Sequence, residues 1–290
     1  MIEQIIVTGL VISGIYSLLA IGFSLVVGVA RIVNLSHTAA YMLAAYFVYL
    51  FSVMLEISPV ISMILAIIIP TIVGIISYIL TMNRIQAHET ALLLVTIALA
   101  MLFQEIVFLG FSSKVKSIQP IIPGFISIFN IRVSNQQLLT FAIALVCLIF
   151  VWFLLSKTKL GLFIRATAED REIANVMGIN PSVIRLITVA IASALAALGG
   201  VIVAPLYAIK PDMWTSPLIT IIAIAVLGGL GSVKGSILGA FILGFVETSV
   251  VLLAPQLGFL RGPVALLIMV VVLLIRPEGL FGVAFEEERL

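Results

Sequence analysis

The stretch QIIVTGLVISGIYSLLAIGFSLVVGVA, residues 4–30, contains no Asp, Glu, Lys or Arg. A helix needs about 20 residues to cross a hydrocarbon layer about 30 Å thick. This run is long enough to do so, and it is far too long for a strand. Strands of a membrane barrel would also alternate in polarity, which this run does not. It predicts a membrane-spanning helix, and hence an all-α fold.

Similar apolar runs recur along the chain. Two of them tolerate one carboxylate, Glu105 or Glu247, and the last is short. The predicted spans are 4–30, 32–55, 57–83, 90–113, 133–156, 186–209, 213–233, 235–260 and 262–275. We expect a polytopic membrane helical bundle with eight or nine transmembrane segments, in which residues 30–40 and 228–236 are either re-entrant breaks or parts of full crossings. Residues 1–290 form a single transmembrane domain in this interpretation.

Composition excludes most other classes of protein. Of 290 residues, 63% are hydrophobic and 10% are charged, against about 25% charged in an average soluble domain. A mean hydropathy of +1.34 leaves too few polar groups to cover a water-exposed surface. The net charge of +2 gives no reason to expect nucleic acid as a partner. The single cysteine, Cys147, excludes a disulfide within the chain and a cysteine-based metal site.

The basic residues predict the orientation of the chain. With nine spans, the connections on one face hold ten of the fifteen basic residues, and those on the other face hold five. The richer face carries Arg31, Arg84, Lys157, Lys159, Arg165, Arg171, Arg185, Lys234, Arg276 and Arg289, and the poorer face carries Lys114, Lys116, Arg132, Lys210 and Arg261. By the positive-inside rule, we expect a multi-pass protein of the cell (plasma or inner) membrane, with the N-terminus outside and the C-terminus cytoplasmic.

The sizeable cytoplasmic loop, residues 157–185, contains a predicted short helix over 168–177. Thr167 and Asp170 have the spacing of a capping box at its start, and Gly178 is a typical terminator. Glu169, Asp170 and Glu172 would then lie in the first turn, where negative charge favours the helix dipole.

Three residues of this predicted helix, Ile173, Val176 and Met177, are spaced to share one apolar face. Such a helix suits docking into a groove on a soluble partner. It suits equally an amphipathic helix that lies on the lipid headgroups. The pattern alone does not decide between the two.

The arrangement Glu172-x-Ala174-x-x-x-Gly178 resembles the cytoplasmic "EAA…G" loop of ABC importer permeases, with Ile173 in place of the first alanine after the glutamate. Wider matches resemble the branched-chain amino acid permeases of the high-affinity leucine/isoleucine/valine uptake system. They are GLVISGIYSL (9–18), VARIVNLSH (29–37), AEDR (168–171), MGIN (177–180), LGGLGSVKG (227–235) and RPEGLFG (276–282). Ser36-His37-Thr38 stands where many relatives have Ala-His-Gly.

The resemblance implies a permease subunit of an ATP-binding cassette importer for branched-chain or related hydrophobic amino acids. Its implied partners are ATP-binding subunits, a second permease subunit (a paralogue or a copy of itself) and an extracytoplasmic substrate-binding protein. The implied ATPase-coupling residues are Thr167, Glu169, Asp170, Arg171, Glu172, Ile173, Ala174, Val176, Met177 and Gly178. The chain has no GxxxxGK[ST] loop, which is the usual phosphate-binding motif of ATPases. We therefore expect that the chain is not an enzyme, that it binds no cofactor of its own, and that its partners bind the ATP.

Six further residues are candidates for the transport pathway: Asn34, His37, Gly228, Gly229, Gly231 and Glu247. Each has a simpler interpretation. Asn34 and His37 are typical capping or packing residues, and the glycines form either a break between half-helices or a ridge for close packing. A glutamate inside a span is either functional or a hydrogen-bonded packing residue.

Other transport classes remain open from the sequence. An ABC permease for urea, amides or sugars is the nearest alternative. An ion-coupled secondary transporter would need its own ion-coupling group, and Glu247 is the only good candidate for it in the sequence. A membrane-embedded enzyme would need clustered catalytic groups, and the sequence shows none.

Overall fold

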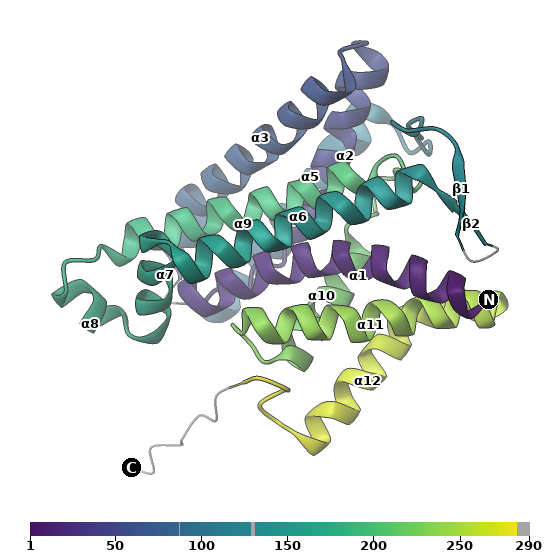
Figure 1. Ribbon diagram of the computed structural model, residues 1–290. Coiled ribbons are helices and arrows are strands. Elements are labelled where there is room, and N and C mark those ends of the chain that lie inside the picture. The colour runs from purple at the N-terminus through teal and green to yellow at the C-terminus, as the bar shows by residue number, and fades with distance from the viewer. Residues whose placement is uncertain (87, 129–130, 283–290) are drawn as a thin grey trace.

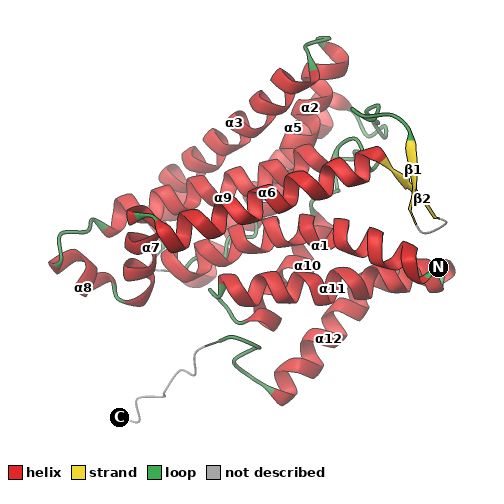
Figure 2. Cartoon of the chain, in the orientation of Figure 1, coloured by secondary structure: helices red, strands yellow, loops and turns green. Residues whose placement is uncertain are grey.

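The computed structural model describes residues 1–86, 88–128 and 131–282, so the basic residue Arg289 lies outside the described residues. The described chain is mostly helical, with one small hairpin (Figure 2). Several helices end in or begin with a π-helical or 3₁₀ turn. The elements are α1 (Ile2–Leu25, extended by Val26–Ala30), α2 (His37–Tyr49, extended by Leu50–Met54), α3 (Pro59–Ser77, extended by Tyr78–Met82), α4 (Asn83–Ile85), α5 (Glu89–Phe111), β1 (Phe125–Ile128), β2 (Ile131–Ser134), α6 (Asn135–Lys157), α7 (Lys159–Glu169), α8 (Arg171–Val176), α9 (Pro181–Val203), α10 (Thr215–Gly228), α11 (Val233–Leu253) and α12 (Arg261–Ile275, preceded by Pro255–Leu260).

Eight helical segments of the described chain are long and apolar enough to cross a membrane. The expectation of a polytopic helical bundle is therefore confirmed. The short predicted run 262–275 gains length at its start, because a 3₁₀ turn over Pro255–Leu260 leads directly into α12. Together these residues make a helical segment of 21 residues.

The predicted span 213–233 is wrong as a full-length crossing. Helix α10 has 14 residues, which is about 21 Å and shorter than the hydrocarbon layer. It ends at Gly228, and a tight turn follows in which Gly229 (φ +98°) and Gly231 (φ +81°) have left-handed backbones. Ser232 then caps α11 by accepting a hydrogen bond from the Gly235 N–H at 3.1 Å. Of the two alternatives left open for residues 228–236, the structure shows a break, which joins the short α10 to a full-length span, α11.

The core of the bundle consists of α1, α2, α9 and α10, while α3, α5, α6 and α12 expose most of their surface. In the most apolar window of each span, 78% of residues are buried for α1 and 6% for α12. Exposed apolar side chains cover the outer helices, as expected where lipid is the solvent. Figure 1 shows α1 running through the bundle between α6 and α11.

Small residues let α1 and α11 approach closely as antiparallel neighbours. Gly9 lies against Phe245 near one end, and Gly28 lies against Gly231 at the other. Between them, the hydroxyls of Ser24 and Ser236 are 2.5 Å apart. Packing of small residues and interhelical hydrogen bonds are the forces that hold helices together in lipid.

The two ends of the bundle carry different structures (Figure 1). Helices α7 and α8 form one end, and the N-terminus and the β1–β2 hairpin lie at the opposite end. Residues 276–282, which we call the C-terminal strap, return to the end of α10. The Leu280 N–H donates to the Leu227 carbonyl at 2.8 Å, and the Phe281 N–H donates to the Gly228 carbonyl at 3.0 Å. The strap therefore extends the α10–α11 turn by backbone pairing.

The connection between α5 and α6 contains the β1–β2 hairpin, which the sequence analysis did not predict. Its strands are antiparallel, with Ile126 opposite Val133. Alternating β-branched and polar residues on both sides of Asn130 were the signal that could have revealed it. A backbone bridge from Lys116 to Ile209 joins this connection to the segment that precedes α10.

Candidate functional site

The predicted helix over 168–177 is in fact two helices. Thr158 caps α7 by accepting a hydrogen bond from the Gly161 N–H at 3.1 Å, and α7 continues to Glu169. Thr167 thus lies inside α7, buried, instead of capping a new helix. Asp170 has an extended backbone, and its carboxylate accepts hydrogen bonds from the N–H groups of Glu172 at 2.8 Å and Ile173 at 2.9 Å.

The predicted capping box of Thr167 and Asp170 is therefore wrong, because Asp170 is itself the cap of the second helix, α8. Glu172 remains in a first turn, that of α8, whereas Glu169 lies at the end of α7. Threonine and aspartate are both good N-caps, so the sequence alone does not show which of the two precedes the helix. Because α7 begins after Thr158 and continues to Glu169, Thr167 lies inside α7 and Asp170 is the cap of α8.

Replacing Asp170 with alanine removes two hydrogen bonds from the exposed amides of α8. We expect a loss of about 1 kcal/mol in the stability of this helix, with the transmembrane helices unchanged. Asp170→Asn keeps a capping oxygen and is the matched control. Amide hydrogen exchange at residues 172–176 should rise in the alanine variant and stay near wild type in the asparagine variant. Equal exchange in wild type and the alanine variant would contradict the capping role.

Helix α8 ends as the sequence predicts. The Gly178 N–H donates to the Asn175 carbonyl, and the Ile179 N–H donates to the Ala174 carbonyl, each at 3.0 Å. These two bonds form a Schellman motif, and Gly178 adopts the required left-handed backbone, with φ +83°. The oxygen of Asn180 then caps α9. The tight turn fixes the direction in which α8 points.

The apolar residues of α8 face away from the bundle. The exposed fractions are 63% for Ile173, 86% for Val176 and 76% for Met177, whereas Ala174 is buried against the protein. We call these three exposed residues the α8 face. Glu169 and Glu172 are exposed beside it. The residues that the resemblance implies for coupling thus lie together at the end of α7 and in α8, where Ile173, Val176 and Met177 face outward and Thr167 and Ala174 are buried.

Arg171 connects α8 to the core of the bundle. Its Nη2 donates to the carbonyl of Val29, in the last turn of the α1 segment, at 3.1 Å. The neighbouring Gly28 touches the backbone of Gly231 in the α10–α11 turn. A Cβ on Gly229 in that turn would collide with the backbone of the C-terminal strap. A continuous series of contacts therefore runs from α8 through the end of α1 to the start of α11.

Asn34 and His37 lie on the wall of a small cavity between α2, α3 and α9, with Ser77 and Ser193 also lining it. Each also has a local structural role. The side-chain oxygen of Asn34 accepts hydrogen bonds from the N–H (3.0 Å) and hydroxyl (2.7 Å) of Ser36, which closes the turn before α2. The Nε2 of His37 donates to the Leu19 carbonyl at 3.1 Å. These contacts explain the burial of both side chains.

Glu247 is buried inside the protein, with 4% of its surface exposed, and it joins three helices. The Tyr16 hydroxyl of α1 donates to one carboxylate oxygen at 2.7 Å, and the Thr220 hydroxyl of α10 donates to the other at 2.8 Å. Glu247 itself belongs to α11. Its contacts favour the packing interpretation over an ion-coupling one. Gly228 ends α10 and Gly229 and Gly231 lie in the α10–α11 turn, whereas Glu247 lies about 21 Å along α11 from Val233.

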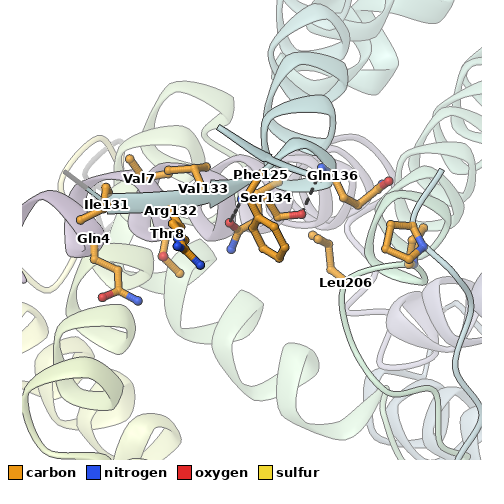
Figure 3. A pocket seen from close by; sticks show the side chains of 13 residues that line it. Gln4, Val7, Thr8, Phe125, Ile131, Arg132, Val133, Ser134, Gln136 and Leu206 are labelled. Carbon is orange, nitrogen blue, oxygen red and sulfur yellow. Dashed lines mark hydrogen bonds between the residues drawn. The ribbon is translucent and has the colours of Figure 1, made fainter. Parts of the chain in front are cut away.

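A cavity of about 340 Å³ lies near the N-terminal end of the bundle, and the sequence analysis did not predict it. Figure 3 shows Gln4 and Thr8 of α1 and Arg132 of β2 around it. Gln136 also lines it and accepts a hydrogen bond from the Ile121 N–H at 2.9 Å. The polar residues 135–137 were the one sequence signal for this cavity. Its wall could not be predicted, because three segments that are distant in the sequence form it.

The family model described as the permease component of the branched-chain amino acid transport system matches residues 5–275. The chain belongs to this family. The high-affinity branched-chain amino acid transport system permease protein BraD of Pseudomonas aeruginosa is 30% identical over 96% of this chain and 95% of its own length. The permease protein LivH of Escherichia coli is 24% identical over 94% of this chain and 93% of its own length.

Two further comparisons place this branched-chain permease among other proteins. The ribose import permease protein RbsC of Escherichia coli is 35% identical, but the match covers only 35% of this chain. The solved structure of PsaBC from Streptococcus pneumoniae in complex with Fab has a TM-score of 0.55 and 14% identity, covering 96% of this chain and 97% of that one. That likeness shows a shared fold. The relatives that match nearly the full length are branched-chain permeases, so the alternatives of a sugar, urea or amide permease are not favoured.

Proposed function

We propose that this chain is the membrane subunit of an ATP-driven importer for branched-chain or related hydrophobic amino acids. The observation that carries the proposal is the α8 face, an exposed apolar surface hydrogen-bonded through Arg171 to the core of a branched-chain permease. An apolar helical face held outside a membrane bundle suits a groove on a soluble partner. Family membership favours this partner over the alternative in which α8 lies on lipid.

In this proposal the ATP-binding subunits and the substrate-binding protein bind at opposite ends of the bundle. ATP-binding subunits dock on the α8 face and bind all of the ATP, so the permease needs no cofactor of its own. A second permease subunit, a paralogue or a copy of this chain, supplies the other half of the pathway. A substrate-binding protein delivers the amino acid at the end that carries the hairpin and the cavity of Figure 3.

The proposed orientation places the N-terminus outside the cell and α8 in the cytoplasm. Two observations support it. The N-terminus and the hairpin lie at the end opposite α8. Five basic residues lie at the α8 end, namely Lys157, Lys159, Arg165, Arg171 and Arg185. A positively charged connection stays on the cytoplasmic side during insertion.

The contacts suggest how closure of the ATP-binding subunits opens the pathway. A push on α8 reaches the end of α1 through the Arg171–Val29 hydrogen bond. The end of α1 lies against Gly231, so the α10–α11 turn moves with it. Because α10 crosses only part of the membrane, a shift of this short helix changes the barrier between the two sides.

Proteoliposomes test the proposal. We expect the permease, combined with its ATP-binding subunits, second permease subunit and binding protein, to accumulate labelled leucine when ATP is supplied. The permease alone should accumulate none, whether a proton or a sodium gradient is applied. Ion-driven accumulation by this chain alone would contradict the proposal. Competition by excess valine but not by ribose would support the substrate class, and the reverse would overturn it.

A further inference from the structure

Three arginines from separate segments gather at the α8 end of the bundle. Arg31 follows the end of the α1 segment, Arg171 begins α8, and Arg185 lies near the start of α9. Burial, together with the positive charges of Arg185 and then Arg31, lowers the pKa of Arg171 below its ordinary value. The positive charges of Arg185 and Arg31 thus act on Arg171, and the opposing effect of Tyr78 is smaller. We call these residues the arginine cluster.

The hydrogen-bond partners of the cluster within the described residues are all neutral. Arg171 donates to the Val29 carbonyl at 3.1 Å. Arg185 donates to the side-chain oxygen of Gln86 and, at 3.1 Å, to the Ser182 hydroxyl. The Nε atoms of Arg171 and Arg185 are buried and have no partner in the described part of the chain. Like charges held together without an acceptor of opposite charge leave the site in need of an anion.

The backbone conformation of Arg31 also supports a bound anion. Its φ of +53° lies in the left-handed region, where glycine is favoured and other residues are strained. Arginine nevertheless occupies this position, and its side chain is exposed while Arg171 and Arg185 are half-buried. The cluster is therefore open to its surroundings on the side of Arg31.

The position of the arginine cluster relative to the ends of the membrane spans indicates what it contacts outside the protein. Arg31 directly follows the last residue of the first span, Gln86 directly follows the third span, and Arg185 lies within the first turns of the α9 span. Two of these positions follow the C-terminal end of a span and the third lies near the N-terminal end of one, and all three are where the apolar runs stop at the α8 end of the bundle. This is the level of the lipid headgroups, and basic pockets between helices at that level bind phosphate-bearing lipids.

We propose that Arg31, Arg171 and Arg185 bind the phosphate of an anionic phospholipid headgroup in the leaflet at the α8 end. Guanidinium groups suit this ligand, because their forked N–H donors match phosphate oxygens in pairs. A lipid bound here would hold together the end of α1, the start of α8 and the start of α9. The inference goes beyond the proposed function, since it concerns a ligand of the permease other than its substrate or its protein partners.

Thermal unfolding of the purified permease in neutral detergent tests the proposal without any transport partner. We expect phosphatidylglycerol to raise Tm by several degrees more than phosphatidylcholine does. In the double variant Arg31→Gly/Arg185→Gln, the apparent affinity for phosphatidylglycerol should fall about tenfold or more, to that for phosphatidylcholine. Glycine suits the left-handed backbone at position 31, so this change removes the charge without straining the chain.

The matched control is Lys159→Gln/Arg165→Gln, which removes two exposed charges of α7 at the same end of the bundle. This variant should keep the preference for phosphatidylglycerol. An equal loss in control and cluster variants would overturn the site in favour of general charge attraction. Protection by inorganic phosphate as large as that by phosphatidylglycerol would overturn the lipid and indicate a free anion.

A second measurement covers the case in which the double variant fails to fold. Arg185→Lys keeps the charge but loses the forked donors, and we expect it to fold and to bind phosphatidylglycerol more weakly than wild type. Native mass spectrometry, with phosphatidylglycerol and phosphatidylcholine added in equal amounts, counts the lipids that each variant retains. Equal retention of phosphatidylglycerol by wild type and Arg185→Lys would contradict the arginine cluster as the binding site.

Discussion

Replacing Val176 and Met177 together with glutamate will abolish ATP-driven amino acid uptake while the membrane bundle stays folded. Both side chains are more than three-quarters exposed, so within the described chain the substitution removes little packing. In the importer that we propose, the same side chains would enter a groove of an ATP-binding subunit, where two buried carboxylates would lack partners. Uptake into proteoliposomes should fall to the level without ATP, whereas Tm of the purified permease should change little.

Two further variants separate docking from other effects. Val115→Glu places a new charge on an exposed apolar residue at the opposite end of the bundle and should leave the association of the permease with its ATP-binding subunits intact, whereas the Val176/Met177 variant should lose it. Gly178→Pro should abolish uptake by another route, because proline cannot adopt the φ of +83° that ends α8. Membrane insertion should persist, since residue 178 lies outside the spans. Full uptake in the Val176/Met177 variant would remove the α8 face from the docking surface.

Replacing Gly235 with alanine will destabilise the bundle more than any change at an exposed position. A Cβ on Gly235 would overlap the backbone carbonyl of Gly228, where α10 ends. Backbone cannot move aside as a flexible side chain does, so the helices on both sides of the turn must separate. We expect a loss of about 3 kcal/mol or more in the free energy of unfolding.

Gly262→Ala is the matched control for this prediction, since a Cβ there meets nothing within 4 Å. Both glycines lie in the first turn of a helix, α11 or α12, so the difference in helix propensity between glycine and alanine is similar. Unfolding in mixed detergent micelles compares the two. If the two variants unfolded alike, close packing at the α10–α11 turn would not be the source of stability that we infer.

The transmembrane helices could be predicted from the sequence because the thickness of the hydrocarbon layer fixes their length. The short length of α10 was only partly predictable: the glycines at 228–231 offered a break, but residues 213–233 are apolar enough to suit a full span as well. What ends α10 at Gly228 is tertiary contact, namely the strap on one side and the closely packed Gly28 on the other. Gly178 and Asn180 were predictable because each acts on its immediate neighbours in the chain.

Features that join distant segments gave no local signal. Tyr16, Thr220 and Glu247 meet although 231 positions separate the first from the last. The arginine cluster likewise draws on the end of one helix and the beginnings of two others. Contacts between distant segments leave no periodic pattern in the sequence. The spacing of Ile173, Val176 and Met177 within one helix, by contrast, correctly predicted that they share an exposed face.

The C-terminal strap has a consequence for biosynthesis. Among the described residues, 276–282 are the last that a ribosome makes, yet they pair with Leu227 and Gly228 in the interior of the chain. Until the strap emerges from the exit tunnel, the end of α10 lacks its backbone partners. The nascent permease therefore completes its architecture only after α12 has been synthesised, and a chain truncated before Leu280 would reach the bilayer unfinished.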